Sequence, residues 1–135
     1  MTKEQYFTLK SELKAMAQQI KSAKLYHHTA QKDFSTCERE RGSVADYYKG
    51  LIPSVKWESA RSEYNRLYEL QLDLYRGVQS LKHDFRHLHM VYCFARGKTR
   101  EQIERKVREG NEPDSKRLES LMEKYDVKES IPTTA

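Results

Sequence analysis

Apolar residues recur at alternating spacings of three and four along two long stretches of the chain, and this periodicity restricts the fold more than any other feature. Such spacing places the side chains on one stripe of an α-helix, whereas a strand would require alternation at every second residue. The first series comprises Tyr6, Leu9, Leu13, Met16, Ile20, Ala23, His27, Ala30, Phe34 and Cys37. The second comprises Trp57, Ala60, Tyr64, Leu67, Gln71, Leu74, Val78, Leu81, Phe85, Leu88, Tyr92 and Ala95. Each series predicts one long helix with a heptad seam.

Local signals set the ends of these helices. Thr2 and Gln5 have the spacing of a capping box, and Gly42 and Gly97 are typical of helix C-termini. The predicted helices therefore run over about residues 3–41 and 54–96, and a tip loop at residues 42–53 joins them. Two helices of equal length with a short connection predict an antiparallel coiled-coil hairpin over residues 1–97.

The antiparallel arrangement predicts which residues face one another. Tyr6 should lie near Tyr92, and His27 should lie opposite Gln71, with which it would share a buried hydrogen bond. The N-terminus, the end of the second helix and the residues after 97 should gather at one end of the hairpin, which we call the open end. Cys37 and Cys93 should be buried and too far apart for a disulfide.

The remaining chain predicts two short helices over residues 98–126 and a frayed tail at residues 127–135. Thr99 and Gln102 form a second capping box, and the helix that they begin should end at Gly110. The last helix should follow Pro113. Its apolar stripe consists of Leu118, Leu121, Met122 and Tyr125. The predicted fold is all-α, with a long antiparallel hairpin followed by two short C-terminal helices.

Composition agrees with long helices and with a single domain. The 135 residues include only five glycines and three prolines, and 33% of the residues are charged. The formal net charge of +5 is compatible with nucleic acid or an acidic protein surface as a partner. The sequence contains no long apolar run, so we expect a cytoplasmic protein with no membrane association.

No arrangement of residues typical of an active site is evident, which predicts a protein that is not an enzyme and needs no cofactor. The nearest approach to a metal site is His83 with His87, since residues four apart share a helix face. Lys82 and Arg86 would repel a cation there, and Asp84 replaces the glutamate of zinc proteases. We therefore interpret this segment as an exposed basic face and predict no metal.

Two other groups of residues point to a partner. Positive side chains favour the open end and are predicted to contact nucleic acid or an acidic partner: Lys10, Lys14, Lys21, Lys82, Arg86, Arg96, Lys98, Arg100, Lys116 and Arg117. A stripe beside the second seam is predicted to anchor a partner through large amphipathic rings: Tyr64, Tyr68, Leu72 and Tyr75. Packing of that stripe on the tip loop or on a second copy of the chain remains an alternative.

The segment from Arg86 to Glu104 supports two resemblances. The run Arg96-Gly97-Lys98-Thr99-Arg100-Glu101-Gln102-Ile103 is similar to the entry of the second helix in helix-turn-helix regulators of bacteria. The segment also resembles small uncharacterised proteins encoded by tailed bacteriophages, through Arg86-His87-Leu88-His89, Tyr92, Arg96-Gly97-Lys98-Thr99 and Gln102-Ile103-Glu104. That second resemblance implies a viral accessory protein acting in the cytoplasm of a bacterial host, without implying a substrate or site residue.

These observations lead to two hypotheses. The first is a non-enzymatic accessory protein, encoded by a phage, that binds a host or viral macromolecule through the hairpin surface and the basic open end. The second is a nucleic-acid-binding regulator that uses the helix-turn-helix-like C-terminal unit.

Overall fold

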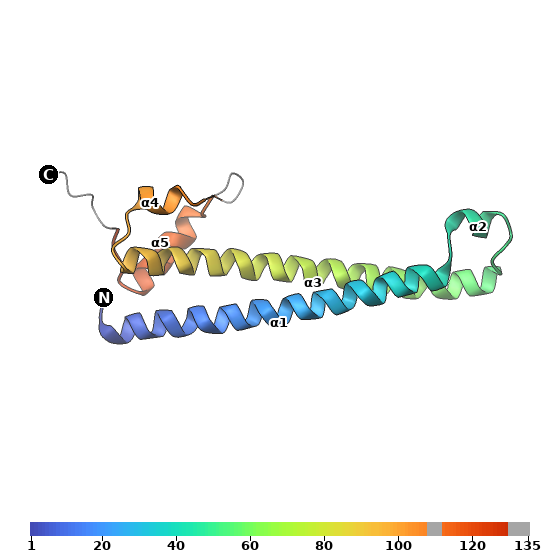
Figure 1. The fold of residues 1–135 in the computed structure, drawn as a ribbon, viewed down its shortest axis with the longest axis horizontal. Helices are drawn as coiled ribbons and strands as arrows, with labels where there is room; N and C mark the ends of the chain where they lie inside the picture. Colours follow the sequence, from blue (N-terminus) through green and yellow to red (C-terminus); the bar gives the residue numbers. More distant parts are fainter. Residues whose placement is uncertain (108–111, 130–135) are drawn as a thin grey trace. The chain divides into compact units, whose positions relative to one another are not determined.

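The computed structural model describes residues 1–107 and 112–129 (Figure 1). The elements in chain order are α1 (Lys3–Arg41), α2 (Val44–Tyr48), α3 (Ser54–Ala95), α4 (Arg100–Glu104) and α5 (Ser115–Lys124). No strand occurs in these residues, so the predicted all-α class is confirmed. Within the same ranges, no helix combines the length and the apolar character that crossing a membrane requires.

The heptad seams were predicted correctly, because every position of both series is buried or half-buried. The capping box at the start of α1 is also present. The Thr2 amide donates to Gln5 Oε1 at 2.8 Å, and the Gln5 amide donates to Thr2 Oγ1 at 3.1 Å. These two bonds satisfy amide groups that have no partner within the helix, and they explain why α1 begins so near the N-terminus.

The chain forms two compact units. The terminal unit contains residues 1–19 together with the described residues from 81 onwards, and the middle unit contains residues 20–80. This division differs from the predicted one, which separated residues 1–97 from residues 98–126, because the C-terminal helices belong to the same unit as the beginning of α1.

In the middle unit, ring contacts join α1 to α3 in opposite order along the two helices. Phe34 contacts Tyr64 with ring centroids 4.9 Å apart, and His27 contacts Tyr75 at 5.6 Å. The predicted hydrogen bond between His27 and Gln71 is wrong, since none joins them in the described chain. The His27 ring instead packs against the Tyr75 ring of α3, which covers part of the half-buried imidazole.

Aromatic packing closes the tip of the middle unit. Tyr47 of α2 stacks on Trp57 of α3 with centroids 4.7 Å apart. The Arg41 guanidinium lies over the Trp57 ring at 4.8 Å and over the Tyr64 ring at 4.0 Å. The predicted tip loop therefore includes a short helix, and a cation–π contact ties the end of α1 to the beginning of α3.

The terminal unit has the larger apolar core, which all its elements share. Its buried members are Leu9, Leu88, Met90, Val91, Cys93, Phe94, Ile103, Leu118, Met122, Tyr125 and Val127. In this unit α3 therefore buries a second face as well as its seam, and α4 and α5 cover that face. The stacked rings of Tyr6 and Tyr92, 6.0 Å apart, confirm the predicted proximity of these two residues.

Two predictions for the C-terminal region require correction. The short helix α4 ends at Glu104, and its predicted end at Gly110 lies outside the described residues. The tail predicted to fray from residue 127 instead begins with packed residues. Val127 is buried and Glu129 accepts hydrogen bonds from Arg100, whereas residues 130–135 lie outside the described chain.

Candidate functional site

The histidine pair of α3 differs from its prediction. His87 is only 1% exposed, so the prediction of an exposed face is wrong for this residue. Its Nδ1 lies 2.8 Å from the His83 carbonyl oxygen, and the Asp114 amide donates to its Nε2 at 2.7 Å. These partners define a neutral imidazole protonated at Nδ1, because one nitrogen faces an acceptor and the other faces a donor. His87 therefore positions the start of α5 and has no nitrogen left for a metal.

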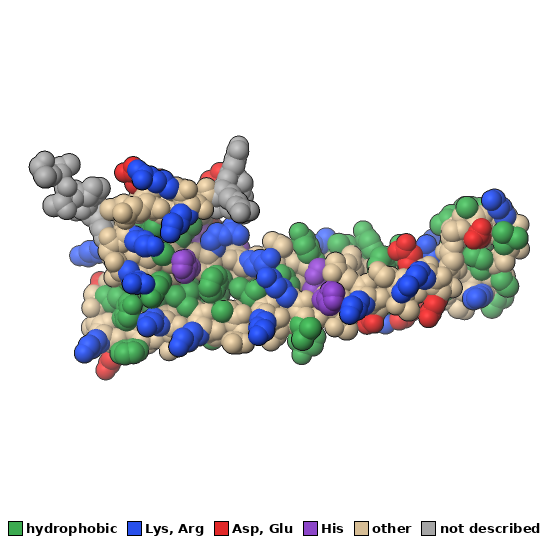
Figure 2. Space-filling model, viewed as in Figure 1, with side chains coloured by type: hydrophobic (Ala, Val, Ile, Leu, Met, Phe, Trp, Pro, Cys, Tyr) green, Lys and Arg blue, Asp and Glu red, His purple; other side chains and the backbone are tan. Residues whose placement is uncertain are grey.

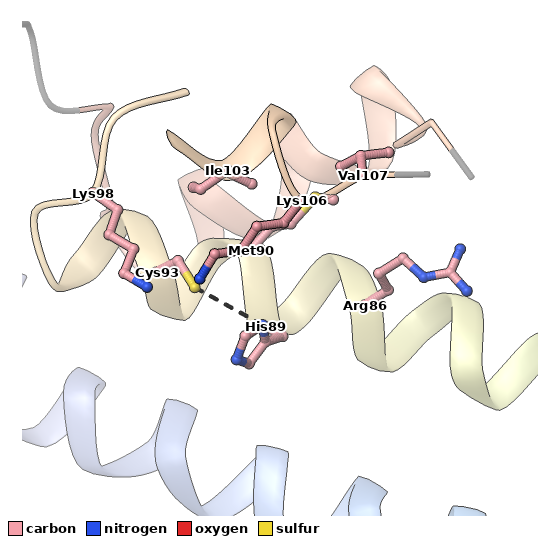
Figure 3. Close-up of a pocket in the computed structure, with 8 residues that line it drawn as sticks. All are labelled: Arg86, His89, Met90, Cys93, Lys98, Ile103, Lys106 and Val107. Atoms are coloured by element: carbon pink, nitrogen blue, oxygen red, sulfur yellow. Dashed lines mark hydrogen bonds between the residues drawn. The ribbon is translucent and has the colours of Figure 1, made fainter. Parts of the chain in front are cut away.

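A pocket of about 380 Å³ lies in the terminal unit, between the end of α3 and the segment that contains α4 (Figure 3). Its lining is divided between positively charged and apolar side chains, with one histidine. The lining residues are Arg86, His89, Met90, Cys93, Lys98, Ile103, Lys106 and Val107. None of the eight is acidic, so an anion is the charged ligand that this pocket favours.

Backbone hydrogen bonds fix where Lys98 enters the pocket. Gly97 has a φ of +86°, and the Lys98 amide donates to the Cys93 carbonyl at 3.1 Å. This is the bonding pattern of a helix that ends with glycine in the left-handed conformation. The side chain of Lys98 consequently lies beside the last turns of α3, near Cys93 and His89 (Figure 3).

The short helix α4 fixes the opposite side. Thr99 and Gln102 form the predicted capping box, in which the Thr99 amide donates to Gln102 Oε1 at 3.0 Å. The helix ends with the Lys106 amide donating to the Ile103 carbonyl at 3.1 Å. Ile103 is buried against α3, and the Lys106 side chain extends towards Cys93 (Figure 3). Both lysines are thus held on a rigid backbone.

The two lysines also lack an acidic partner among the described residues of the unit. Within the described part of the chain, no carboxylate lies within ion-pair distance of either Lys98 or Lys106. Figure 2 shows further lysine and arginine side chains on the visible face of the terminal unit, with hydrophobic side chains between them. The pocket cations Arg86, Lys98 and Lys106 therefore belong to a unit whose visible face carries further positive charge.

His89 responds to this positive environment. Its Nδ1 lies 3.8 Å from Cys93 Sγ, and its ring stacks on Phe85 with centroids 6.1 Å apart. Partial desolvation lowers the pKa of His89 below its ordinary value of 6.5, and the charges of Lys98 and Lys106 lower the pKa further. His89 is therefore mainly neutral at neutral pH while the pocket holds no anion.

The structure brings together only some of the cations predicted to bind a partner. Arg86 and Lys98 line the pocket, and Lys82 lines an adjoining hollow with Phe85, Arg86 and His89. Arg100 instead pairs with Glu129, and Arg117 pairs with Asp84 at 2.5 Å. The charges of these two arginines are therefore partly offset by carboxylates of the same unit.

The other predicted cations lie on the surface. Lys10 and Arg96 each lie over a tyrosine ring, those of Tyr6 and Tyr92, at 5.6 and 5.7 Å. The remaining three, which are exposed, are Lys14, Lys21 and Lys116. Lys21 belongs to the middle unit, whereas Lys14 and Lys116 belong to the terminal unit.

The predicted aromatic stripe lies in the middle unit. Tyr68 is 43% exposed and Tyr75 is 49% exposed, whereas Tyr64 and Leu72 are half-buried. Tyr64 and Tyr68 both contact the Phe34 ring, at 4.9 and 5.8 Å. The stripe is therefore partly covered by α1, while Tyr68 and Tyr75 each keep nearly half of their surface exposed.

Sequence reasoning missed Lys106, Cys93 and the apolar wall of the pocket as parts of a site. One signal was present, because Arg86, Met90 and Cys93 recur at helical spacing outside the seam. The position of Lys106 depends on where α4 ends, and the glycine signal placed that end at Gly110, whereas α4 ends at Glu104.

Comparison with known proteins adds no functional assignment. Searches of protein families, of curated proteins and of solved structures find no match to this chain. The described residues also contain no group of three or more histidine, cysteine, aspartate or glutamate side chains placed to hold a metal ion.

Proposed function

We propose that this chain is a non-enzymatic accessory protein that binds an acidic host or viral macromolecule. The observation that carries the proposal is the half-exposure of Tyr68 and Tyr75 beside a seam that is already filled. Each ring contacts α1 on one side, Tyr68 at Phe34 and Tyr75 at His27, and keeps its remaining surface exposed. Partially exposed tyrosines are typical anchors of protein interfaces. In the terminal unit, Lys98 and Lys106 form no ion pair within the described chain, and their positive charge favours an acidic macromolecule.

The setting of this function is part of the proposal. The resemblance to proteins of tailed bacteriophages covers Arg86 to Glu104, and this range includes six of the eight residues that line the pocket. We infer a phage-encoded protein that acts in the cytoplasm of a bacterial host. We also infer that α1 and α3 form one antiparallel hairpin, since antiparallel contacts occur separately in each unit, Tyr6 with Tyr92 and Phe34 with Tyr64.

Partner capture from a host lysate tests the tyrosine anchors. The double variant Tyr68→Ala, Tyr75→Ala should lose the captured protein, because truncation of central aromatic anchors costs about 2 kcal/mol or more each. Tyr26→Ala is the matched control, since Tyr26 is 68% exposed and has no ring contact in the described chain. Circular dichroism should show unchanged helix content in both. Equal capture by the double variant and the wild-type chain would contradict the proposal.

A nucleic-acid-binding regulator is the second candidate function, favoured by the capping box that begins α4. Two observations oppose it. Leu118 and Met122 bury one face of α5, and Arg117 and Lys124 on the same helix pair with Asp84 and Glu12. Titration of a labelled duplex at two salt concentrations separates the candidates, because phosphate contacts weaken steeply as salt rises. Absence of binding at low salt excludes the regulator.

A further inference from the structure

We propose that the pocket of the terminal unit binds an organic phosphate monoester, with its phosphate between Lys98 and Lys106 and its organic group on the apolar wall. This goes beyond the proposed binding of a macromolecule, because it assigns a small-ligand site to the pocket whose two lysines also supply positive charge in the proposed function.

The charges of the lining residues favour a dianion. Lys98 and Lys106 converge on Cys93 and His89 from the two ends of the α4 segment (Figure 3). Their ammonium groups repel each other, and no acidic residue lines the pocket. A carboxylate would neutralise one of the two charges and leave the other unbalanced. A phosphate monoester carries close to two negative charges at neutral pH, and its three terminal oxygens can accept hydrogen bonds from both lysines.

The apolar part of the lining favours a ligand with a hydrocarbon body. Met90, Ile103 and Val107 line the pocket beside the two lysines. Its volume of about 380 Å³ lies in the range of small-molecule sites and far exceeds what a bare inorganic ion requires. An aromatic or other compact apolar group attached to the phosphate would displace water from this wall.

Binding of the phosphate should change the protonation of His89. The groups that face or adjoin its ring are Lys82, Phe85, Arg86, Tyr92, Cys93, Lys98 and Lys106. None of them is a carboxylate, and the two lysines contribute to the lowered pKa of His89. An anion bound between those lysines offsets their charge and therefore raises the pKa of His89. Binding should take up a proton, and it should strengthen as the pH falls through the bound-state pKa of His89 while the ligand remains a dianion.

Calorimetric titration of the full chain with phenyl phosphate tests the proposal. Inorganic phosphate is the control for the apolar group, and benzoate is the control for the dianion. Phenyl phosphate should bind about tenfold more tightly than either control at neutral pH and low salt. Two further ligands distinguish the source of the phosphate: adenosine 5′-monophosphate represents a free small molecule, and a 5′-phosphorylated oligonucleotide represents the end of a nucleic acid. Binding of either compound supports the site. Benzoate binding as tightly as phenyl phosphate would overturn the proposal.

Variants locate the binding. Lys98→Ala and Lys106→Ala should each weaken phenyl phosphate binding about tenfold. Lys56→Ala is the matched control, because Lys56 is an exposed lysine of α3 in the middle unit. A separate measurement needs no variant, since phenyl phosphate should raise the pKa of His89 when its ring signals are followed by NMR. Undiminished binding in both pocket variants, or a His89 titration that the ligand does not change, would contradict this site.

Discussion

At the scale of single residues, buried polar groups join the C-terminal segment to the long helices. His87 uses both ring nitrogens to link the His83 carbonyl on α3 to the Asp114 amide at the start of α5. The Asp114 side chain in turn accepts hydrogen bonds from the amides of Lys116 and Arg117. One imidazole thus connects the side of α3 to the N-cap of α5, and each bond would be costly to break in a buried setting.

Tyr125 makes a comparable link to α1. Its ring is 3% exposed, and its hydroxyl donates a hydrogen bond to the Glu12 carboxylate. Tyr125→Phe keeps the packed ring and removes this bond, so the free energy of unfolding should fall by about 1 kcal/mol, measured by urea denaturation. Tyr26→Phe is the control, because its ring is 68% exposed and its stability should not change. Equal stability of both variants would show that the bond contributes nothing.

The same hydroxyl predicts a pH dependence. Burial, followed by the hydrogen bond to Glu12 and the charge of Glu12, raises the pKa of Tyr125 above its ordinary value of 10.0. Stability from this group is fully present below the ordinary pKa and is lost as the pH rises through the higher folded-state pKa. The difference in unfolding free energy between wild type and Tyr125→Phe should therefore shrink above pH 10. A constant difference there would contradict the linkage.

At the scale of elements, the turn from α1 to α2 requires glycine. Gly42 has a φ of +86°, and a Cβ built on it would lie 2.5 Å from Ile52 Cδ1. Gly42→Ala should therefore destabilise the chain by about 1–3 kcal/mol, through backbone strain and the displacement of Ile52. Gly77→Ala is the opposite control, because Gly77 lies within α3 with open space around its Cα.

Both glycine variants are measured by thermal unfolding. Gly77→Ala should raise the free energy of unfolding by about 0.5–1 kcal/mol, since alanine restricts the unfolded chain and favours helix. The prediction requires shifts of opposite sign. Stabilisation by Gly42→Ala would mean that the chain can leave α1 without the left-handed conformation.

The long helices were predictable because their information is local and repeated. Each seam position repeats the same spacing, and the glycines that end α1 and α3 both have positive φ. The second buried face of α3 was not predicted, because Val91 and Phe94 are buried by residues more than eight positions away in sequence, from α4 onwards. The candidate pocket was predicted only in part. The sequence identified Arg86 and Lys98 by their charge, whereas His89, Cys93 and Lys106 are brought to the pocket by tertiary packing.

At the scale of the whole molecule, the C-terminal segment completes a core that the long helices leave open. Leu88, Val91 and Phe94 are each no more than 3% exposed, and they share a cluster with Ile103, Leu118 and Met122. Without the residues after 97, this face of α3 would be a contiguous apolar patch at the surface, which promotes association. The segment therefore contributes to the solubility of the chain as well as forming one side of the candidate pocket.

A chain that ends at Gly97 tests this role. It should remain helical by circular dichroism, because the seams and the N-terminal capping box lie within residues 1–97. It should also self-associate in light scattering at concentrations where the full chain does not, since its exposed apolar face can be buried against another copy. Replacing Val91 and Phe94 by lysine in the shortened chain should reverse the association, because lysine carries charge into the patch. If light scattering finds the same number of chains per particle for the shortened chain and the full chain, the long helices already bury this face without the C-terminal segment.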